Sequence, residues 1–177
     1  NKRTYIEPMD INEIFHEVMA HRMVINRIYE NNNGSWVQLG QNIDGEATND
    51  QSSGGTTGIS LNGDGTIVAI GALYNDGNGN NSGHTRIFEY DGILWSQIGQ
   101  DIDGENIADQ SGYSVSLNNQ GNKVAIGAPD NDGGIIGSQS GHVRVFSVGT
   151  GTQYTSPPCS GCTDSLAVNY DPYSLID

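Results

Sequence analysis

Basic residues are scarce in this sequence: seven lysines and arginines stand against 21 aspartates and glutamates, which gives a formal net charge of −14. Proteins bind nucleic acids through clustered Lys and Arg, so this balance argues against DNA or RNA as a partner. Long apolar runs are absent too, and none approaches the roughly 20 residues that a membrane-spanning helix requires. We therefore expect no membrane span, and the opening residues NKRTYIEPMD lack the apolar core of a signal peptide.

Cysteine is limited to Cys159 and Cys162. A zinc site would need four ligands, and no βαβ pattern surrounds the pair to suggest a redox fold. We therefore interpret this CxxC as a disulfide formed in an oxidising compartment.

Glycine, in contrast, is abundant, with 25 residues, while hydrophobic residues make up 34% and charged residues 16% of the chain. Glycine and asparagine accept the positive φ angles that turns need, so this composition favours many short strands joined by turns over packed helices. An acidic, Asn-rich surface is also compatible with bound Ca²⁺, which is the one cofactor that the composition suggests.

The central part of the chain is repeated. Residues 36–52 read WVQLGQNIDGEATNDQS and residues 95–111 read WSQIGQDIDGENIADQS, with 11 of 17 positions identical at an offset of 59. Further along, ISLNGDGTIVAIGAL matches VSLNNQGNKVAIGAP, and SGHTRIFEY matches SGHVRVFSV. Such self-similarity predicts a repeat architecture.

Each copy contains a series of strand signals. Tyr113, Val115 and Leu117 alternate with serines, which is the period of a half-buried strand. After a turn at 62–65 or 118–121, the further expected strands are 67–72 and 123–128, then 84–90 and 142–148, and last 94–99. Four antiparallel strands in a unit of this length are typical of a β-propeller blade.

Two blades cannot close a propeller ring, which typically has four to eight. We interpret residues 57–99 as one whole blade, 113–148 as three strands of another, and 35–40 as a lone fourth strand that caps the second blade's open edge. The expected fold class is mainly β: two four-stranded antiparallel blade-like repeats, an incomplete propeller, preceded by one amphipathic helix. Neighbouring subunits, a longer chain or a small stacked arrangement would complete the sheets.

The expected helix lies in the first 34 residues, over 10–30, with Asp10 as its N-cap and NNNG at 31–34 as its end. Apolar side chains fall on one face at helical spacing: Ile11, Ile14, Phe15, Val18 and Met19. Such a helix either packs on its own β domain or is shared between chains, and we assign 1–34 as a helical assembly or anchoring segment. Glu13 and Glu17 weaken a membrane-surface role, because such helices favour basic residues.

The second copy resembles the FG-GAP repeat of the integrin α-subunit propeller. The family's Phe-Gly and Gly-Ala-Pro frame maps onto Gly112–Val115 and Gly127–Pro129, and GHVRVF follows at 141–146. The first copy departs from the frame, since SSGGTTGIS has three extra residues and Gly-Ala-Leu replaces Gly-Ala-Pro. The resemblance covers roughly residues 35–150, divided into repeats 35–99 and 100–150, and implies a β-propeller-like surface or secreted protein.

The remaining residues, 151–177, form a linker followed by a short tail. GCTDSLAVNYDP at 161–172 resembles the GCTD…NYDP repeat found near the C-terminal end of secreted bacterial and viral proteins. That repeat normally continues to a further cysteine, which is the usual partner of the residue at Cys162, so the tail is interpreted as truncated.

The two acidic loops carry oxygen side chains at relative positions 1, 3, 5 and 9. These side chains are Asn42, Asp44, Glu46 and Asp50 in the first loop, and Asp101, Asp103, Glu105 and Asp109 in the second. This spacing can wrap a Ca²⁺ ion, although the glycine lies at position 4 rather than at position 6 as in an EF-hand. The FG-GAP family holds its Ca²⁺ between the first two strands of a blade, where this chain has a short hairpin, so that site is not carried over. The other interpretation is that Asp and Gly simply form the turn.

No arrangement of nucleophile and base, phosphate loop or paired general acid and base is found in the sequence, so we do not expect an enzyme. We expect a non-enzymatic extracellular, cell-surface or virion-surface protein that builds assemblies, as a homo-oligomer or in a larger structure. The alternative is adhesion or glycan recognition through the loops at 74–82 and 130–140. His84 and His142 are interpreted as packing residues repeated between the copies.

Overall fold

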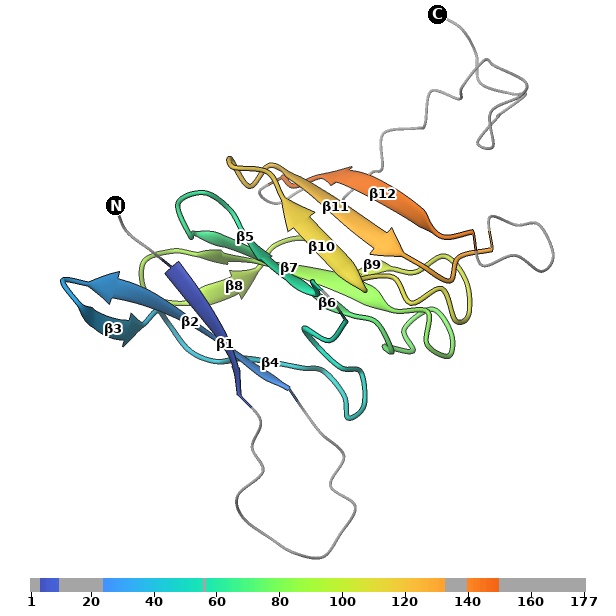
Figure 1. Cartoon of the computed structure of the whole chain (residues 1–177), viewed down its shortest axis with the longest axis horizontal. Helices are drawn as coiled ribbons and strands as arrows, with labels where there is room; N and C mark the ends of the chain where they lie inside the picture. Colours follow the sequence, from blue (N-terminus) through green and yellow to red (C-terminus); the bar gives the residue numbers. More distant parts are fainter. Residues whose placement is uncertain (1–3, 10–23, 56, 133–139, 150–177) are drawn as a thin grey trace, which may run out of the picture.

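The protein is mainly β, as a computed structural model shows; the structure describes residues 4–9, 24–55, 57–132 and 140–149. Its strands are β1 (Thr4–Met9), β2 (Ile25–Asn32), β3 (Ser35–Gln38), β4 (Ile43–Asp44), β5 (Ile59–Leu61), β6 (Ile67–Ala72), β7 (His84–Tyr90), β8 (Trp95–Gln97), β9 (Ile102–Asp103), β10 (Ser114–Leu117), β11 (Lys123–Ala128) and β12 (His142–Ser147). The described residues form no helix (Figure 1).

The strands form three antiparallel sheets, none of which is closed. The first sheet has the order β1-β2-β3, with β4 also paired to β2; the middle sheet has the order β5-β6-β7-β8, with β9 also paired to β7; the last sheet has the order β10-β11-β12. In the first and middle sheets the short strands β4 and β9 extend the edge on which β3 and β8 lie. Each sheet is therefore built from consecutive segments of the chain.

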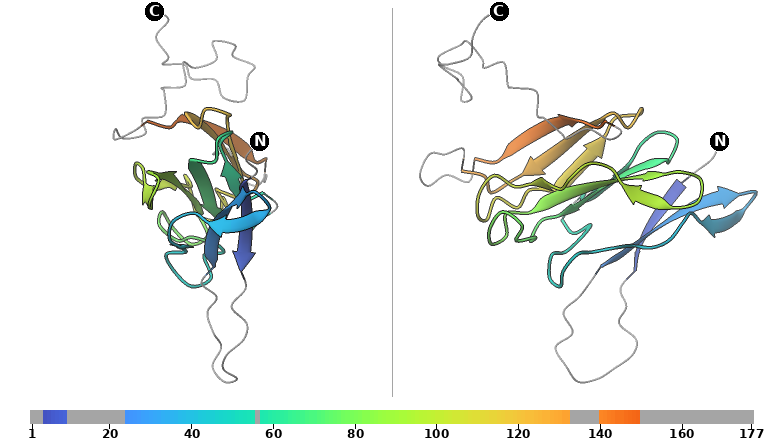
Figure 2. Two further views of the ribbon diagram at one scale, coloured as in Figure 1. Left: turned by 90° about the vertical axis from the view of Figure 1, so that its left-hand side faces the viewer. Right: turned by 180° about the vertical axis from the view of Figure 1, so that it is seen from behind.

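The sheets are stacked face to face, with the middle sheet between the other two (Figures 1 and 2). One core lies between the first and middle sheets and includes Ile28, Ile43, Val68, Ile70, Phe88 and Trp95. The other core lies between the middle and last sheets and includes Ala69, Ile87, Ile102, Val115, Leu117, Val124, Ile126 and Phe146. Both faces of the middle sheet are covered, so its strands are apolar at successive positions, as in IVAIGA at β6.

Asparagine side chains define the hairpins that join the first two strands of the middle and last sheets. Asn62 Oδ1 accepts hydrogen bonds from the backbone N–H groups of Thr66 and Ile67, both at 2.9 Å. Asn118 Oδ1 accepts one from the N–H of Lys123 at 3.0 Å. The turn at 62–65, between the first two strands of the middle sheet, is thus held by its own side chains.

The helix expected over 10–30 is wrong for residues 24–30, which enter and form most of β2. Asn26 and Ile28 are fully buried while their neighbours are half-buried, which is the period of a strand and not of a helix. The segment INRIYE pairs along its length with β1, from Met9↔Ile25 to Thr4↔Glu30. The apolar positions on which the helix was based, Ile11, Ile14, Phe15, Val18 and Met19, lie outside the described residues.

The expected strands of the two copies are confirmed, and their pairing is antiparallel as predicted. The role given to 35–40 is wrong, because β3 pairs with β2 of its own hairpin and not with the last sheet. The boundary placed after residue 34 accordingly falls inside the β2–β3 hairpin. The described residues thus form three antiparallel sheets rather than two, and most of β2 in the first sheet lies within the expected helix.

Candidate functional site

The two acidic loops connect one sheet to the next, and we call them the first connector (residues 40–55) and the second connector (residues 99–113). The first connector runs from the first sheet to the middle sheet, and the second from the middle sheet to the last sheet. Each contains a two-residue strand, β4 or β9, that pairs with the sheet it has just left.

The connectors have the same backbone conformation. Positive φ angles occur at alternate positions in both: at Asn49, Gln51 and Ser53, and at Ala108, Gln110 and Gly112. Five of these six residues are not glycine, and such residues rarely adopt the left-handed region. Because the strained pattern recurs at equivalent positions, contacts with the neighbouring sheets hold the loop in one shape.

An arginine of the next sheet binds each connector. Arg86 on β7 donates from Nη2 to the carbonyl oxygen of Asp44 at 2.7 Å, and Arg144 on β12 donates to the carbonyl oxygen of Asp103 at 2.5 Å. Each guanidinium also lies over the ring of the phenylalanine two residues along its strand, at 5.4 and 5.3 Å. The arginine therefore ties the connector to the sheet that follows it.

A buried carboxylate makes a second tie in each connector. Asp50 Oδ2 accepts a hydrogen bond from Asn75 Nδ2 at 2.9 Å, and Asp109 Oδ2 accepts one from Asn131 Nδ2 at 2.8 Å. The two aspartates are 6% and 2% exposed. Since a buried carboxylate is costly without donors, these asparagines account for part of its stabilisation.

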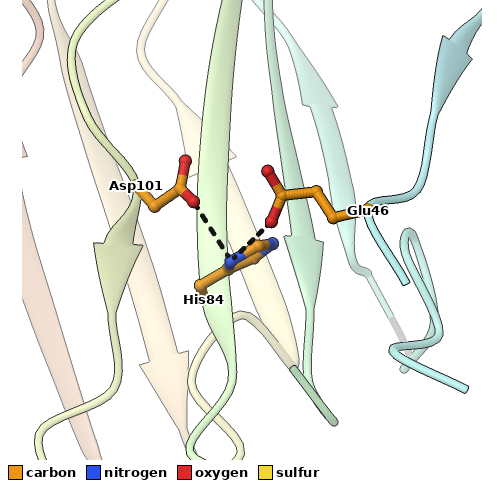
Figure 3. Close-up of side chains that lie close together, drawn as sticks. All are labelled: Glu46, His84 and Asp101. Carbon is orange, nitrogen blue, oxygen red and sulfur yellow. Dashed lines mark ion pairs between the residues drawn. The ribbon is translucent and has the colours of Figure 1, made fainter. Parts of the chain in front are cut away.

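His84 joins the two connectors (Figure 3). Its imidazole is almost fully buried on β7, and its Nδ1 atom lies 3.8 Å from Oε2 of Glu46 and 3.7 Å from Oδ2 of Asp101. Glu46 comes from the first connector and Asp101 from the second, and the figure shows the two carboxylates approaching the ring from opposite sides. Their ligand atoms all lie within 4.8 Å of one another.

Burial lowers the pKa of His84, and Arg86 lowers it further, while Asp101, Glu46 and Asp50 act in the opposite direction. The imidazole is therefore neutral at pH 7, and its nitrogen faces two carboxylate oxygens at distances longer than a hydrogen bond. One nitrogen and two oxygens at this spacing can hold a proton or a divalent cation. Arg86 Nη1, 3.5 Å from Glu46 Oε1, already supplies one positive charge to the group.

The last sheet has a smaller version of this arrangement. His142 Nδ1 lies 3.6 Å from Oε2 of Glu105, and Arg144 Nη1 lies 3.8 Å from Oε1 of the same side chain. The pKa of Asp103 is raised, first by burial and second by the charge of Asp101, although Arg144 opposes the shift.

The structure distributes the eight predicted calcium ligands rather than gathering each loop's set. Asn42 accepts hydrogen bonds from Arg27 and Gln38 within the first sheet, and Asp101 Oδ1 accepts one from Gln97. In the described part of the chain, the only group of three His, Cys, Asp or Glu ligand atoms is Glu46, His84 and Asp101, which takes one carboxylate from each loop. Cys159 and Cys162, predicted as a disulfide, lie outside the described residues.

Sequence reasoning missed the partners of the acidic loops. Those partners are His84, Arg86, Asn75, His142, Arg144 and Asn131. A signal for them was present, because Ser-Gly-His-x-Arg and the Asn-Asp-Gly loop recur in both copies together with the acidic loop. Elements that repeat together are candidates for contact, and here each connector contacts the repeat that follows it.

No protein-family model matches the sequence, and no curated protein matches it either. The described residues contain no helix that could serve as a membrane span.

Proposed function

We propose that this protein is a non-enzymatic structural protein, outside the cell or on a particle surface, that builds larger assemblies by stacking blade-like sheets. The FG-GAP resemblance of residues 111–146 supports this proposal, as does the strongly acidic composition of the chain. The connectors support it further, since their side chains Gln41, Glu46 and Glu105 bind neighbouring sheets.

The observation that carries the proposal is an exposed sheet face whose counterparts are buried. The strands β2, β7 and β12 have equivalent positions at Ile28, Ile87 and Val145, because residue 25 of β2 aligns with residue 84 of β7 and residue 142 of β12. Ile28 is 0% exposed and Ile87 is 1% exposed, since the next sheet covers each of them, but Val145 is 54% exposed. Val143 on the same face is 67% exposed, whereas its counterpart Thr85 is fully buried.

At the other end of the stack, the first sheet has an exposed tryptophan whose counterpart in the middle sheet is buried. Trp95 of the middle sheet is buried against the first sheet, and its indole N–H donates to the carbonyl oxygen of Leu39 at 2.8 Å. Its counterpart Trp36 is 51% exposed. Val145 at one end and Trp36 at the other are thus exposed at positions whose counterparts are buried between two sheets. Exposed apolar side chains of this sort favour association of subunits.

Solution mass tests this proposal. We expect sedimentation velocity to show species larger than one chain as concentration rises, and Val145→Asp to shift the chain to a monomer, because a charge on the end face opposes stacking. Ile107→Asp is the control, since Ile107 is 67% exposed in the second connector and away from the end face. A wild-type chain that stays monomeric at every concentration would contradict the proposal.

Calcium binding by the acidic loops and glycan recognition by the loops at 74–82 and 130–140 stay predictions. The loop at 74–82 is held in part by its own bonds, such as Asp76 Oδ1 accepting from the N–H of Asn81 at 2.7 Å.

A further inference from the structure

A pocket of about 390 Å³ opens at one end of the last sheet, where β11 and β12 meet their loops. Its lining includes Gly127, Ala128, Ser140, Gly141, His142 and Val143. The pocket is continuous with the exposed face of β12, because Val143 belongs to both.

The equivalent place on the middle sheet is filled by the chain itself. Gly71, Ala72, Ser82, Gly83 and His84 correspond to Gly127, Ala128, Ser140, Gly141 and His142, and the strands that carry them pair in the same register. The end of the second connector, residues 110–113, packs against Gly71 and Gly83 of the middle sheet.

Backbone contacts fix that segment closely. The N–H of Ser111 donates to the carbonyl oxygen of Ser82 at 2.9 Å, and Gly83 and Ser111 form a parallel bridge. A Cβ added at Gly112 would lie 3.0 Å from Cα of Gly71 and would overlap the carbonyl oxygen of His84. Only a residue without a side chain fits at this point, and its φ of +88° also favours glycine.

The strand after this segment covers the apolar face beside it. Val115 and Leu117 on β10 pack in one core with Ala69 and Ile87 of the middle sheet. The last sheet has Ala125 and Val145 at the positions of Ala69 and Ile87, and Val145 is exposed.

We propose that the pocket and exposed face of the last sheet form a binding site for an extended peptide segment of the sequence type Gln-Ser-Gly-Tyr, followed by a strand with alternating small polar and aliphatic residues. The glycine enters the pocket between Gly127 and His142. The aliphatic side chains of the strand cover Ala125 and Val145. This inference deepens the proposed function, because it names the chemistry of the partner at one end of the stack.

A second copy of the described residues could supply this segment only if its own connector unfolded. Its segment of this type, residues 110–113, and the similar Gln-Ser-Ser at 51–53 are already packed in its connectors. The first sheet of a second copy has no counterpart of β5 among the described strands. If that sheet stacked on the last sheet of the first copy, its described strands would leave the pocket uncovered. The occupant is therefore a segment other than the described residues of a second copy, and it carries the repeat's lead-in and first strand.

A synthetic peptide with the sequence of residues 108–117, ADQSGYSVSL, tests this inference on the whole chain. In a titration of the ¹⁵N-labelled protein followed by two-dimensional NMR, we expect saturable shifts at Gly127, Ala128, Gly141 and Val145. The matched control is the peptide with the change Gly112→Val, ADQSVYSVSL, which should cause no shifts because its Cβ meets the carbonyl oxygen of His142. This control needs no variant of the protein.

Three results would overturn the site: no shifts at millimolar peptide, equal shifts with both peptides, or shifts centred on Ala69 and Ile87, which would mean exchange with β10. Because both proposals use the face that carries Val145, the titration is made at a protein concentration at which sedimentation shows single chains, so that the two proposals fail separately. If the chain associates through Val145 but ignores the peptide, the peptide site is wrong and the assembly proposal stands. If the peptide binds a chain that is always monomeric, the assembly proposal is wrong and the peptide site stands.

Discussion

The imidazole of His84 is buried between two carboxylates, and the balance of burial and charge decides its protonation. Removal from water disfavours the charged ring, whereas Glu46 and Asp101 favour it. Burial is the larger effect, and the pKa of His84 is lowered from its ordinary value of 6.5. One side chain that repeats along the sequence as a packing residue is therefore also a titrating group that links two connectors.

Stability should consequently depend on pH through His84. Between pH 6.5 and the lowered pKa, the unfolded chain binds more protons than the folded chain, so the free energy of unfolding falls as the pH falls below about 6.5 and is highest above it. We expect urea unfolding midpoints to be lower at pH 5.5 than at pH 7.5. His84→Gln should reduce this difference, and an equal difference in both chains would place the pH dependence elsewhere.

Ala108 has a strained backbone conformation, and this strain affects the stability of the chain. Ala108 has φ +64° in the second connector, a conformation that costs an L-residue with a Cβ about 1 kcal/mol. We expect Ala108→Gly to raise the free energy of unfolding by roughly 0.5–1 kcal/mol, measured by urea denaturation. Ala47→Gly in the first connector is the control, because Ala47 has no positive φ and its replacement should not stabilise the chain.

At the scale of elements, the connectors show why spacing alone did not identify a site. Carboxylates at positions 1, 3, 5 and 9 of a loop can wrap a cation only when the backbone turns them inward. Here the loop pairs with one sheet through β4 or β9, and its carboxylates turn to different partners in the sheets on either side and in their loops. The loop's acidic groups therefore mainly bind arginine, histidine and asparagine.

Millimolar calcium should accordingly leave the stability almost unchanged. Of the predicted ligands, Asp50 and Asp109 are occupied by Asn75 and Asn131, and Glu46 lies beside Arg86. We expect thermal unfolding midpoints with CaCl₂ and with EDTA to agree. A midpoint that rises with calcium and saturates would reveal binding to the folded state and support the calcium prediction.

At the scale of the whole molecule, the middle sheet is shared between two apolar cores. Val68 and Ile70 face the first sheet, while Ala69 faces the last sheet from the same strand. Loss of either neighbour would expose one face of the middle sheet, at a cost of roughly 1.5–3 kcal/mol for each large aliphatic or aromatic side chain that becomes exposed. The three sheets should therefore unfold together.

Trp95 provides the test of this cooperativity, because it lies in the core between the first and middle sheets. In Trp36→Phe, which removes the exposed indole, Trp95 is the remaining tryptophan and should emit at short wavelength, since it is 3% exposed. We expect urea transitions followed by its fluorescence and by far-ultraviolet circular dichroism to coincide. If the fluorescence changes at lower urea, the first sheet separates on its own.

Much of the fold could be predicted from local patterns. The alternation in Tyr113–Leu117 located one strand, and the repeated IVAIGA and KVAIGA segments located two more. A strand can be predicted in this way because its alternating burial depends on residues that are neighbours in the sequence. The segment INRIYE was misassigned, since it followed a stretch of helical spacing and lacks a clear alternation of polar and apolar residues. Its match to HTRIFE at the same offset of 59 was the better guide.

The sequence by itself determined the repeat, the strands of the two recognisable copies and the acidic loops between them. Only the tertiary structure decided that residues 25–32 complete a third sheet, that each connector is bound by the sheet after it, and that His84 lies between Glu46 and Asp101. The reason is physical: strand period and turn residues act between near neighbours, whereas stacking depends on which faces meet. Val145 and Ile87 are similar in sequence, and only the presence of a covering sheet makes one exposed and the other buried.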